Sequence, residues 1–464
     1  MSDDHLSLIA HLMRRAGFGG TRAELEIYAA KGYEAVVEDL LHPERFPGVD
    51  EDILKRYFDG ESVNVGAGTW IYRMINSQRP LEEKITLFWH HVLATAFSKS
   101  NHPTSCIEQI DMFRRVGLSD LRTILLELSR DPAMIYWLDN NENHKGEPNE
   151  NYGRELLELF SMGVGNYTEQ DIKMAARAFT GWTFTQPIPL YPFGHHSAHF
   201  VYRAEDHDDS VKTFLGHTGR LNGDDIVGII VQQPAAARFI SRHLYNFFVA
   251  DEPQVPSWSQ LPPRDPRAID TLVQSYVDSG GNIRSMLRVL FNSDFFKEAR
   301  FQRVKSPVEL VVGTVKLTGT HRFPERNLLD LEAATTLMGQ TLMNPPTVEG
   351  WHTGKEWIDG GTLNERVNFA VNELADVNKP GVREIVDRLS AERGLATPEE
   401  LVERALELMG ALQVSADTRD ALLAAARSAI ELRSGAAGAD PPAESARIDR
   451  LLQLIVASRE YQFA

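Results

Sequence analysis

Residues 79–97 read RPLEEKITLFWHHVLATAF, and this stretch predicts an amphipathic helix. Its apolar side chains recur at steps of three and four: Leu81, Ile85, Phe88, Trp89, Val92 and Leu93. This spacing aligns them along one face of an α-helix, which is then buried against the rest of the protein. The same pattern recurs at residues 118–137, 150–162, 169–182, 223–250 and 306–317. The sequence therefore predicts a mainly α protein.

Two long stretches lack helical periodicity. Residues 182–219 are rich in Pro, aromatic residues and His, and residues 344–361 hold two Trp and two Pro. Within the first stretch, residues 198–203 and 211–215 resemble two short strands around a polar turn, which predicts a β-hairpin. Long irregular loops in a helical body usually carry function or cap a core. We expect a large multi-helix single domain with a small β-hairpin insertion and long irregular loops.

Composition places a boundary near residue 375. Residues 5–375 hold the aromatic and polar motifs and predict a helical core. Residues 376–464 are rich in Ala, Glu, Leu and Arg and predict a small helical cap, which we expect to pack on the core as part of the same domain.

Charge and cysteine content exclude several classes of protein. The 464 residues carry a formal net charge of −17, which argues against nucleic acid or an anionic membrane surface as the main partner. The single cysteine, Cys106, excludes an intrachain disulfide and a cysteine-clustered zinc or iron–sulfur site. Phosphate-binding and dinucleotide-binding glycine motifs are absent, so neither a nucleotide nor a flavin is expected. With no secretory leader or membrane span, we expect a cytoplasmic protein, although export stays open if a leader was removed.

The densest polar signal lies at residues 140–171. On a helix starting near Pro148, Glu155 and Glu158 are three residues apart and share a face. Two neighbouring carboxylates suit a divalent metal, or an acid and base whose pKa values are driven apart by repulsion. In the structural alternative, Arg154 simply pairs with Glu158 at the surface.

Two further groups contain titratable side chains. His207, Asp208 and Lys212 bring an imidazole, a carboxylate and a cation to one turn, where the alternative is an exposed polar turn. His90 shares a helix face with Glu83, so we expect His90 to point inward and bond to that carboxylate, with His91 more exposed. A histidine beside Trp89 is, alternatively, a satisfied core residue.

Several sequence blocks together resemble one bacterial family. HLMRRAGFGGT, LFWHHVLAT, PNENYGRELLELFSMGVGNYTEQD, HDDSVKTFLGHTG, VKSPVELVVG and NPPTVEGWHTGKEWI occur in this order, and the chain is similar throughout to the domain-of-unknown-function 1800 family. The resemblance implies a mostly helical single domain without an established reaction. Genes of the family often lie beside those of a second uncharacterised family, number 1501, that resembles sulfatases and alkaline phosphatases, which suggests a sulfatase-like partner. Two residues depart from the family pattern: Val92 stands in place of a second histidine, which argues against a two-imidazole metal site, and Ser210 stands in place of a glycine.

These observations lead to two functional hypotheses. The first is a hydrolase or group-transfer enzyme for a polar, sugar-like or anionic substrate, in which the motifs converge on one cleft. Its expected catalytic residues are Glu155, Glu158, His207, Asp208 and Lys212, its substrate-binding residues Asn149, Asn151, Arg154, Trp182 and Trp351, and its metal ligands His90, Glu155 and Glu158. The second is a non-catalytic binding or maturation partner of a sulfatase-like or alkaline-phosphatase-like protein.

Overall fold

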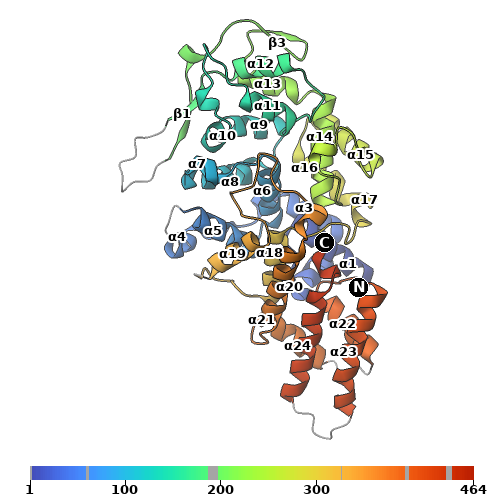
Figure 1. Ribbon diagram of the computed structural model, residues 1–464. Helices are drawn as coiled ribbons and strands as arrows, with labels where there is room; N and C mark the ends of the chain where they lie inside the picture. Colours follow the sequence, from blue (N-terminus) through green and yellow to red (C-terminus); the bar gives the residue numbers. More distant parts are fainter. Residues whose placement is uncertain (1–2, 59–61, 186–196, 326, 392–396, 435–440) are drawn as a thin grey trace.

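Helices make up most of the computed structural model, which describes residues 3–58, 62–185, 197–325, 327–391, 397–434 and 441–464 (Figure 1). The first half of the chain forms α1 (Asp3–Ala16), α2 (Arg22–Lys31), α3 (Tyr33–Leu41), α4 (Glu51–Tyr57), α5 (Val63–Asn76), α6 (Pro80–Val92), α7 (Phe97–Ser100), α8 (Pro103–Val116), α9 (Leu121–Ser129), α10 (Pro132–Trp137), α11 (Asn151–Glu158) and α12 (Glu169–Ala178). The second half forms α13 (Gly223–Ile230), α14 (Pro234–Phe248), α15 (Pro266–Ser279), α16 (Ile283–Asn292), α17 (Asp294–Lys297), α18 (Pro307–Thr318), α19 (Leu328–Leu337), α20 (Gly360–Leu374), α21 (Pro380–Ala391), α22 (Pro398–Leu408), α23 (Ala416–Ser434) and α24 (Pro441–Ala457). The predicted mainly α fold is confirmed.

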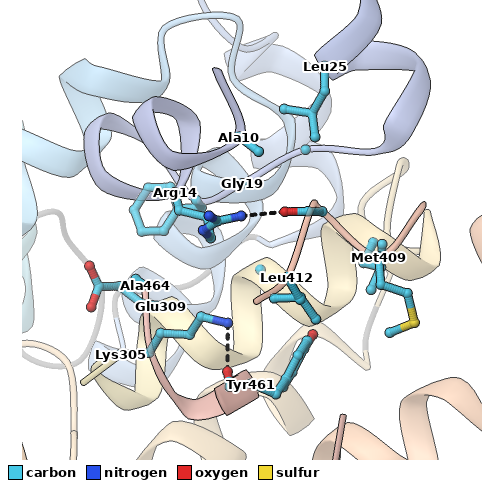
Figure 2. A pocket seen from close by; sticks show the side chains of 15 residues that line it. Ala10, Arg14, Gly19, Leu25, Lys305, Glu309, Met409, Leu412, Tyr461 and Ala464 are labelled. Atoms are coloured by element: carbon cyan, nitrogen blue, oxygen red, sulfur yellow. Dashed lines mark hydrogen bonds between the residues drawn. The ribbon is translucent and has the colours of Figure 1, made fainter. Parts of the chain in front are cut away.

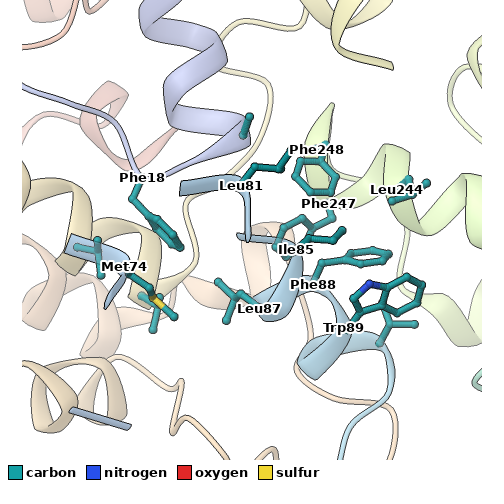
Figure 3. Close-up of a cluster of buried hydrophobic side chains, with 14 of the residues drawn as sticks. Phe18, Met74, Leu81, Ile85, Leu87, Phe88, Trp89, Leu244, Phe247 and Phe248 are labelled. Carbon is teal, nitrogen blue, oxygen red and sulfur yellow. The ribbon is translucent and has the colours of Figure 1, made fainter. Parts of the chain in front are cut away.

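Helix α6 lies at the centre of the hydrophobic core (Figure 3). Leu81, Ile85 and Phe88 are fully buried, as the periodicity predicted. The Phe88 ring packs edge-on against Phe247 of α14, with 5.3 Å between ring centroids. Because each fully buried large apolar side chain contributes about 1.5–3 kcal/mol, this face explains why α6 anchors the surrounding helices.

The small β-structure differs in its pairing from the predicted hairpin. The predicted strands exist as β2 (His199–Tyr202) and β3 (Lys212–Phe214), but they do not pair with each other. Instead β2 pairs antiparallel with β1 (Trp182–Thr185), and β3 pairs antiparallel with β4 (His217–Gly219). The partner strands lie in neighbouring segments, one aromatic and one containing glycine, and neither segment shows a clear alternation of polar and apolar residues. The single predicted hairpin is therefore wrong, and two two-stranded sheets take its place among the described residues.

The C-terminal helices pack on the helical core, and the end of the chain lies back against that core. Helix α22 begins after Thr397, which forms a capping box with Glu400. At the end of the chain, the backbone N–H of Lys305 donates to the carbonyl of Gln462 (2.9 Å), and the guanidinium of Arg366 donates to the Gln462 side chain (2.8 Å). These bonds hold the last residues against the start of α18. The boundary near residue 375 stays a prediction.

A search of the described helices finds none that is both long and apolar enough to cross a bilayer.

Candidate active site

Helix α11 carries the two glutamates predicted from the sequence, and the asparagine-rich turn before it fixes its start. The Asn143 side chain accepts a hydrogen bond from the backbone N–H of Asn149 (2.9 Å), whose own side chain accepts one from the backbone N–H of Asn151 (3.0 Å). The inner face of α11 lies so close to α12 that a Cβ on Gly153 would be 3.1 Å from the backbone nitrogen of Ala176. The glutamates lie on the opposite, outer face.

Glu155 is a half-buried carboxyl group without a hydrogen-bond partner among the described side chains. Burial and the neighbouring carboxylates of Glu158 and Glu349 raise its pKa, while Arg154 lowers it, and the net result is a pKa of about 7. A carboxyl group with a pKa near neutrality holds its proton part of the time at physiological pH. It can therefore act as a general acid or a general base.

The other members of this group have specific partners. Arg154 donates to Glu169 (2.9 Å) and reaches Glu150 at 3.5 Å. The expected surface pair between Arg154 and Glu158 is therefore wrong, because Glu150 and Glu169 bind the guanidinium instead. Glu158 accepts a hydrogen bond from the Tyr167 hydroxyl (2.6 Å). The phenol thus holds one of the two carboxyl groups in a fixed orientation, and Glu155 stays free.

A cleft of about 470 Å³ opens beside the pair. Its lining includes Glu158, Glu349, Phe239, Arg242, Trp258 and Leu261. Glu158 and Glu349, which line the cleft, are also the carboxylates that raise the pKa of Glu155, so Glu155 lies near the cleft without being one of its lining residues. A cleft of this size with convergent polar groups is typical of a small-molecule site.

Trp258 and Phe239 form an aromatic wall of the cleft, whose lining also includes Glu158 and Glu349. Arg242 holds it by an ion pair with buried Glu252 (2.7 Å) and by hydrogen bonds to the carbonyls of Leu261 (3.0 Å) and Pro262 (3.2 Å). The same guanidinium lies 4.5 Å from the Trp258 ring. These contacts fix the proline-rich segment that carries the indole.

Buried His243 packs against both rings of this aromatic wall. Its ring lies 4.6 Å from Trp258 and 4.5 Å from Phe239 between centroids. Burial holds its pKa well below the usual value, so the imidazole is neutral. Its Nε2 is buried without a partner among the described residues.

In the turn formed by residues 207–212, the polar side chains bind other groups of the protein itself. The His207 ring bonds to the Thr180 carbonyl (3.0 Å). Burial alone would raise the pKa of Asp208, but hydrogen bonds from Arg177 and Ser210 hold it well below its usual range. The Lys212 ammonium donates to the carbonyls of Asp208 and Ser210, and burial lowers its pKa. These bonds fasten the turn to the end of α12.

Helix α12 separates this turn from α11, because it packs against β3 on one side and α11 on the other (Figure 1). The charged groups around Lys212 are Asp208, Arg177, Asp209 and Asp225, and none of them is among the groups around Glu155. Contacts among the described residues give no link between the two sets, so their convergence at one cleft stays a prediction.

His90 faces the interior, as expected, but its partner differs from the predicted one. Its Nε2 accepts a hydrogen bond from the backbone N–H of Met343 (2.9 Å). Glu83 instead accepts bonds from the guanidinium of Arg114 (2.9 Å) and the indole of Trp70 (3.0 Å). The predicted bond from His90 to Glu83 is therefore wrong, since a charged donor occupies the carboxylate. His91 is half-buried and thus the more exposed of the two histidines.

The expected metal ligands do not form a cluster. In the part of the chain that the structure describes, no three His, Cys, Asp or Glu side chains are arranged to hold a metal ion. His90, Glu155 and Glu158 are therefore not arranged as a metal site. The imidazole nitrogen Nε2 of His90 already accepts a hydrogen bond from the Met343 backbone.

The expected stacking residues lie in the interior. Trp182 is 2% exposed, packs between Phe179 and Phe200, and donates its indole N–H to Asn222 (2.8 Å). Trp351, which is 5% exposed, packs near Val304 and against the rings of both α6 histidines.

Sequence reasoning missed Trp258, Phe239 and Glu349 as cleft residues. Glu349 belongs to the irregular 344–361 stretch that was expected to carry function, so that stretch was a usable signal. Trp258 lies in the proline-rich stretch PQVPSWSQLPP, residues 253–263, whose composition also indicated an irregular, surface-lying loop.

The fold and the site together define the class of protein: a mainly α, single-domain protein with a pair of glutamates beside a cleft. The chain matches the family described as "Protein of unknown function (DUF1800)" over residues 11–463, nearly its whole length, and it belongs to that family. Neither a curated protein nor a solved structure matches it.

Proposed function

We propose that the protein is a hydrolase or group-transfer enzyme whose glutamate pair acts on a polar, sugar-like substrate bound in the 470 Å³ cleft. One observation carries the proposal: Glu155 is half-buried, has no hydrogen-bond partner among the described side chains and has a pKa of about 7. A structural salt bridge would instead lower the pKa of a glutamate. Groups with strongly raised pKa values in clefts are candidates for acid–base catalysis.

Each residue of the pair has a distinct role in this proposal. Glu155 transfers a proton to or from the substrate, because its pKa lets it carry the proton near neutral pH. Glu158, oriented by Tyr167, is the partner carboxyl group. Trp258 offers a flat apolar surface for the carbon face of a sugar ring.

The charges around the cleft favour one of the two substrate classes, sugar-like and anionic, that the sequence left open. Three carboxyl groups, Glu155, Glu158 and Glu349, lie close together at one side of the cleft. The cations of the lining are paired: Arg242 with Glu252 and Arg238 with Asp270. An anionic substrate would be repelled at this side, so a neutral sugar-like substrate is favoured.

A glycoside screen tests the proposal. The wild-type protein is assayed for reducing-end release from a panel of polysaccharides and for cleavage of chromogenic glycosides. Glu155→Gln should reduce the rate by about 10²–10⁴, because removing a general acid or base costs that much. Glu150→Gln, one turn earlier on the same segment, is the matched control and should retain the rate.

Two outcomes would contradict the proposal: no turnover of any sugar-like substrate by the wild-type protein, or a full rate in Glu155→Gln. Unchanged binding of a sulfatase-like protein by that variant would then favour the alternative proposal of a non-catalytic partner.

A further inference from the structure

A second, smaller cavity lies far from the glutamate pair, between α1, α18 and the end of the chain (Figure 2). Its volume is about 50 Å³. Arg14 at the end of α1 and Lys305 just before α18 extend into its lining, beside the glycine turn at Gly19 and Gly20. Its polar lining therefore holds two cations, together with Glu309 and the last residue, Ala464.

Neither cation has an anionic partner among the described residues. Arg14 donates from Nη1 to the Gly410 carbonyl (2.5 Å), while its Nε and Nη2 are buried without a partner. Lys305 donates to the Tyr461 carbonyl (2.8 Å) and lies 4.2 Å from the Tyr461 ring. Carbonyl oxygens and an aromatic face solvate these charges only in part.

The one carboxylate side chain that lines the cavity is already bound by other groups. Glu309 forms ion pairs with Lys84 and with Arg303 (2.6 Å) and accepts a bond from the backbone N–H of Ser306 (2.8 Å). Besides burial, the cations Arg14, Arg366 and Lys84 lower the pKa of Lys305, whereas Glu309 raises it. Burial lowers the pKa of Lys305 to about 7 and that of Arg14 to about 10. Arg14 and Lys305 are thus cations whose charged forms burial disfavours and which have no carboxylate partner among the described residues.

A buried charge without a counter-ion raises the free energy of the folded protein, and a bound anion would lower it again. We propose that this cavity binds a small tetrahedral oxyanion, either inorganic phosphate or sulfate or the same group on a small ligand, through Arg14 and Lys305. The volume agrees, because one water needs about 10–15 Å³ by this measure and the cavity therefore holds about four waters, enough for one such anion. The two unpartnered N–H groups of Arg14 supply a forked donor that matches an oxyanion.

Calorimetry and thermal unfolding of the full-length protein test this site. Phosphate or sulfate at millimolar concentration should bind at one site per chain and raise Tm above its value in sodium chloride of equal ionic strength. A response to phosphate alone or to sulfate alone supports the proposal and identifies the anion.

Lys305→Met should abolish both the binding heat and the anion-dependent rise in Tm. This variant should stay folded, and its Tm in anion-free buffer should equal or exceed the wild-type value, because an uncompensated buried charge is removed. Arg14→Met should likewise lose anion binding. The matched control is Lys316→Met, another buried lysine, which donates to the Ile75 carbonyl and does not line the cavity; it should keep the response.

Absence of any binding heat and of any Tm rise in the wild-type protein would overturn the proposal. An equal Tm rise in Lys305→Met would also overturn it, because the rise would then be a general salt effect.

Discussion

Glu155 shows how a residue's surroundings rather than its type decide its chemistry. Glu155 and Glu169 lie on adjacent helices, yet Glu169 is bound by Arg154 and has a lowered pKa, whereas burial and two carboxylates raise that of Glu155 to about 7. The spacing of Glu155 and Glu158 was visible in the sequence. Which glutamate receives the arginine was not, because it depends on how α11 lies against α12.

The raised pKa predicts a pH-dependent stability. The folded protein binds the Glu155 proton more tightly than the unfolded chain, whose glutamate has a pKa of 4.5. The stabilisation is therefore complete below about pH 4.5 and is lost as the pH rises through about 7. After allowing for the exposed part of the side chain, the loss is about 1–2 kcal/mol.

Glu155→Gln should remove this pH dependence. Urea unfolding of the wild type and the variant at pH 5 and pH 8 measures it, since all other groups cancel in the comparison. The variant should gain about 1–2 kcal/mol relative to the wild type between the two pH values. A variant that is equally destabilised at both would show that Glu155 is structural.

At the scale of elements, the helices followed from apolar periodicity, as at α6. The two predicted strands exist as β2 and β3, but their partners β1 and β4 were not predicted, because segments of three or four residues carry too little alternation to specify a partner. The asparagine-rich turn was predicted to contact substrate through Asn149 and Asn151, and the structure shows these two residues setting the start of α11.

Asn143 is the central residue of that turn and gives a second prediction. Its side chain is 2% exposed, donates to the carbonyl of Ala176 (2.8 Å) and accepts from the backbone of Asn149 (2.9 Å). Asn143→Ala leaves buried backbone groups unpaired, so we expect a loss of about 2 kcal/mol in the free energy of unfolding. Thermal unfolding checks it, with Asn141→Ala as the control, because the half-buried Asn141 side chain donates to the side chain of Glu142 (2.8 Å) and not to the backbone; equal stability of the two variants would contradict the assignment.

At the scale of the whole molecule, distant segments meet around buried charges that no local pattern reveals. Lys84 of α6 and Arg303 before α18 both bind Glu309, which is also the capping-box residue of α18. The cleft likewise joins α11 to residues of α14 and to Glu349. Periodicity predicts which face of a helix is buried, but it does not specify which distant residue lies opposite.

Glu309→Gln tests this central ion cluster. The variant leaves Lys84 and Arg303 buried without an anion, so unfolding should require about 3–5 kcal/mol less. Adding Lys84→Met should recover part of the loss, because one unpaired charge is removed. Denaturant unfolding of the two single variants and the double variant measures the coupling; strictly additive losses would show that the contact contributes little.

The protonation of Glu155 tests the central claim most directly. Protein labelled with ¹³C at the glutamate side-chain carboxyl can be titrated by NMR, with the Glu155→Gln spectrum identifying the resonance. The account predicts a midpoint near pH 7 for Glu155. A midpoint near the ordinary glutamate value of about 4.3 would contradict it and remove the basis for acid–base catalysis at this cleft.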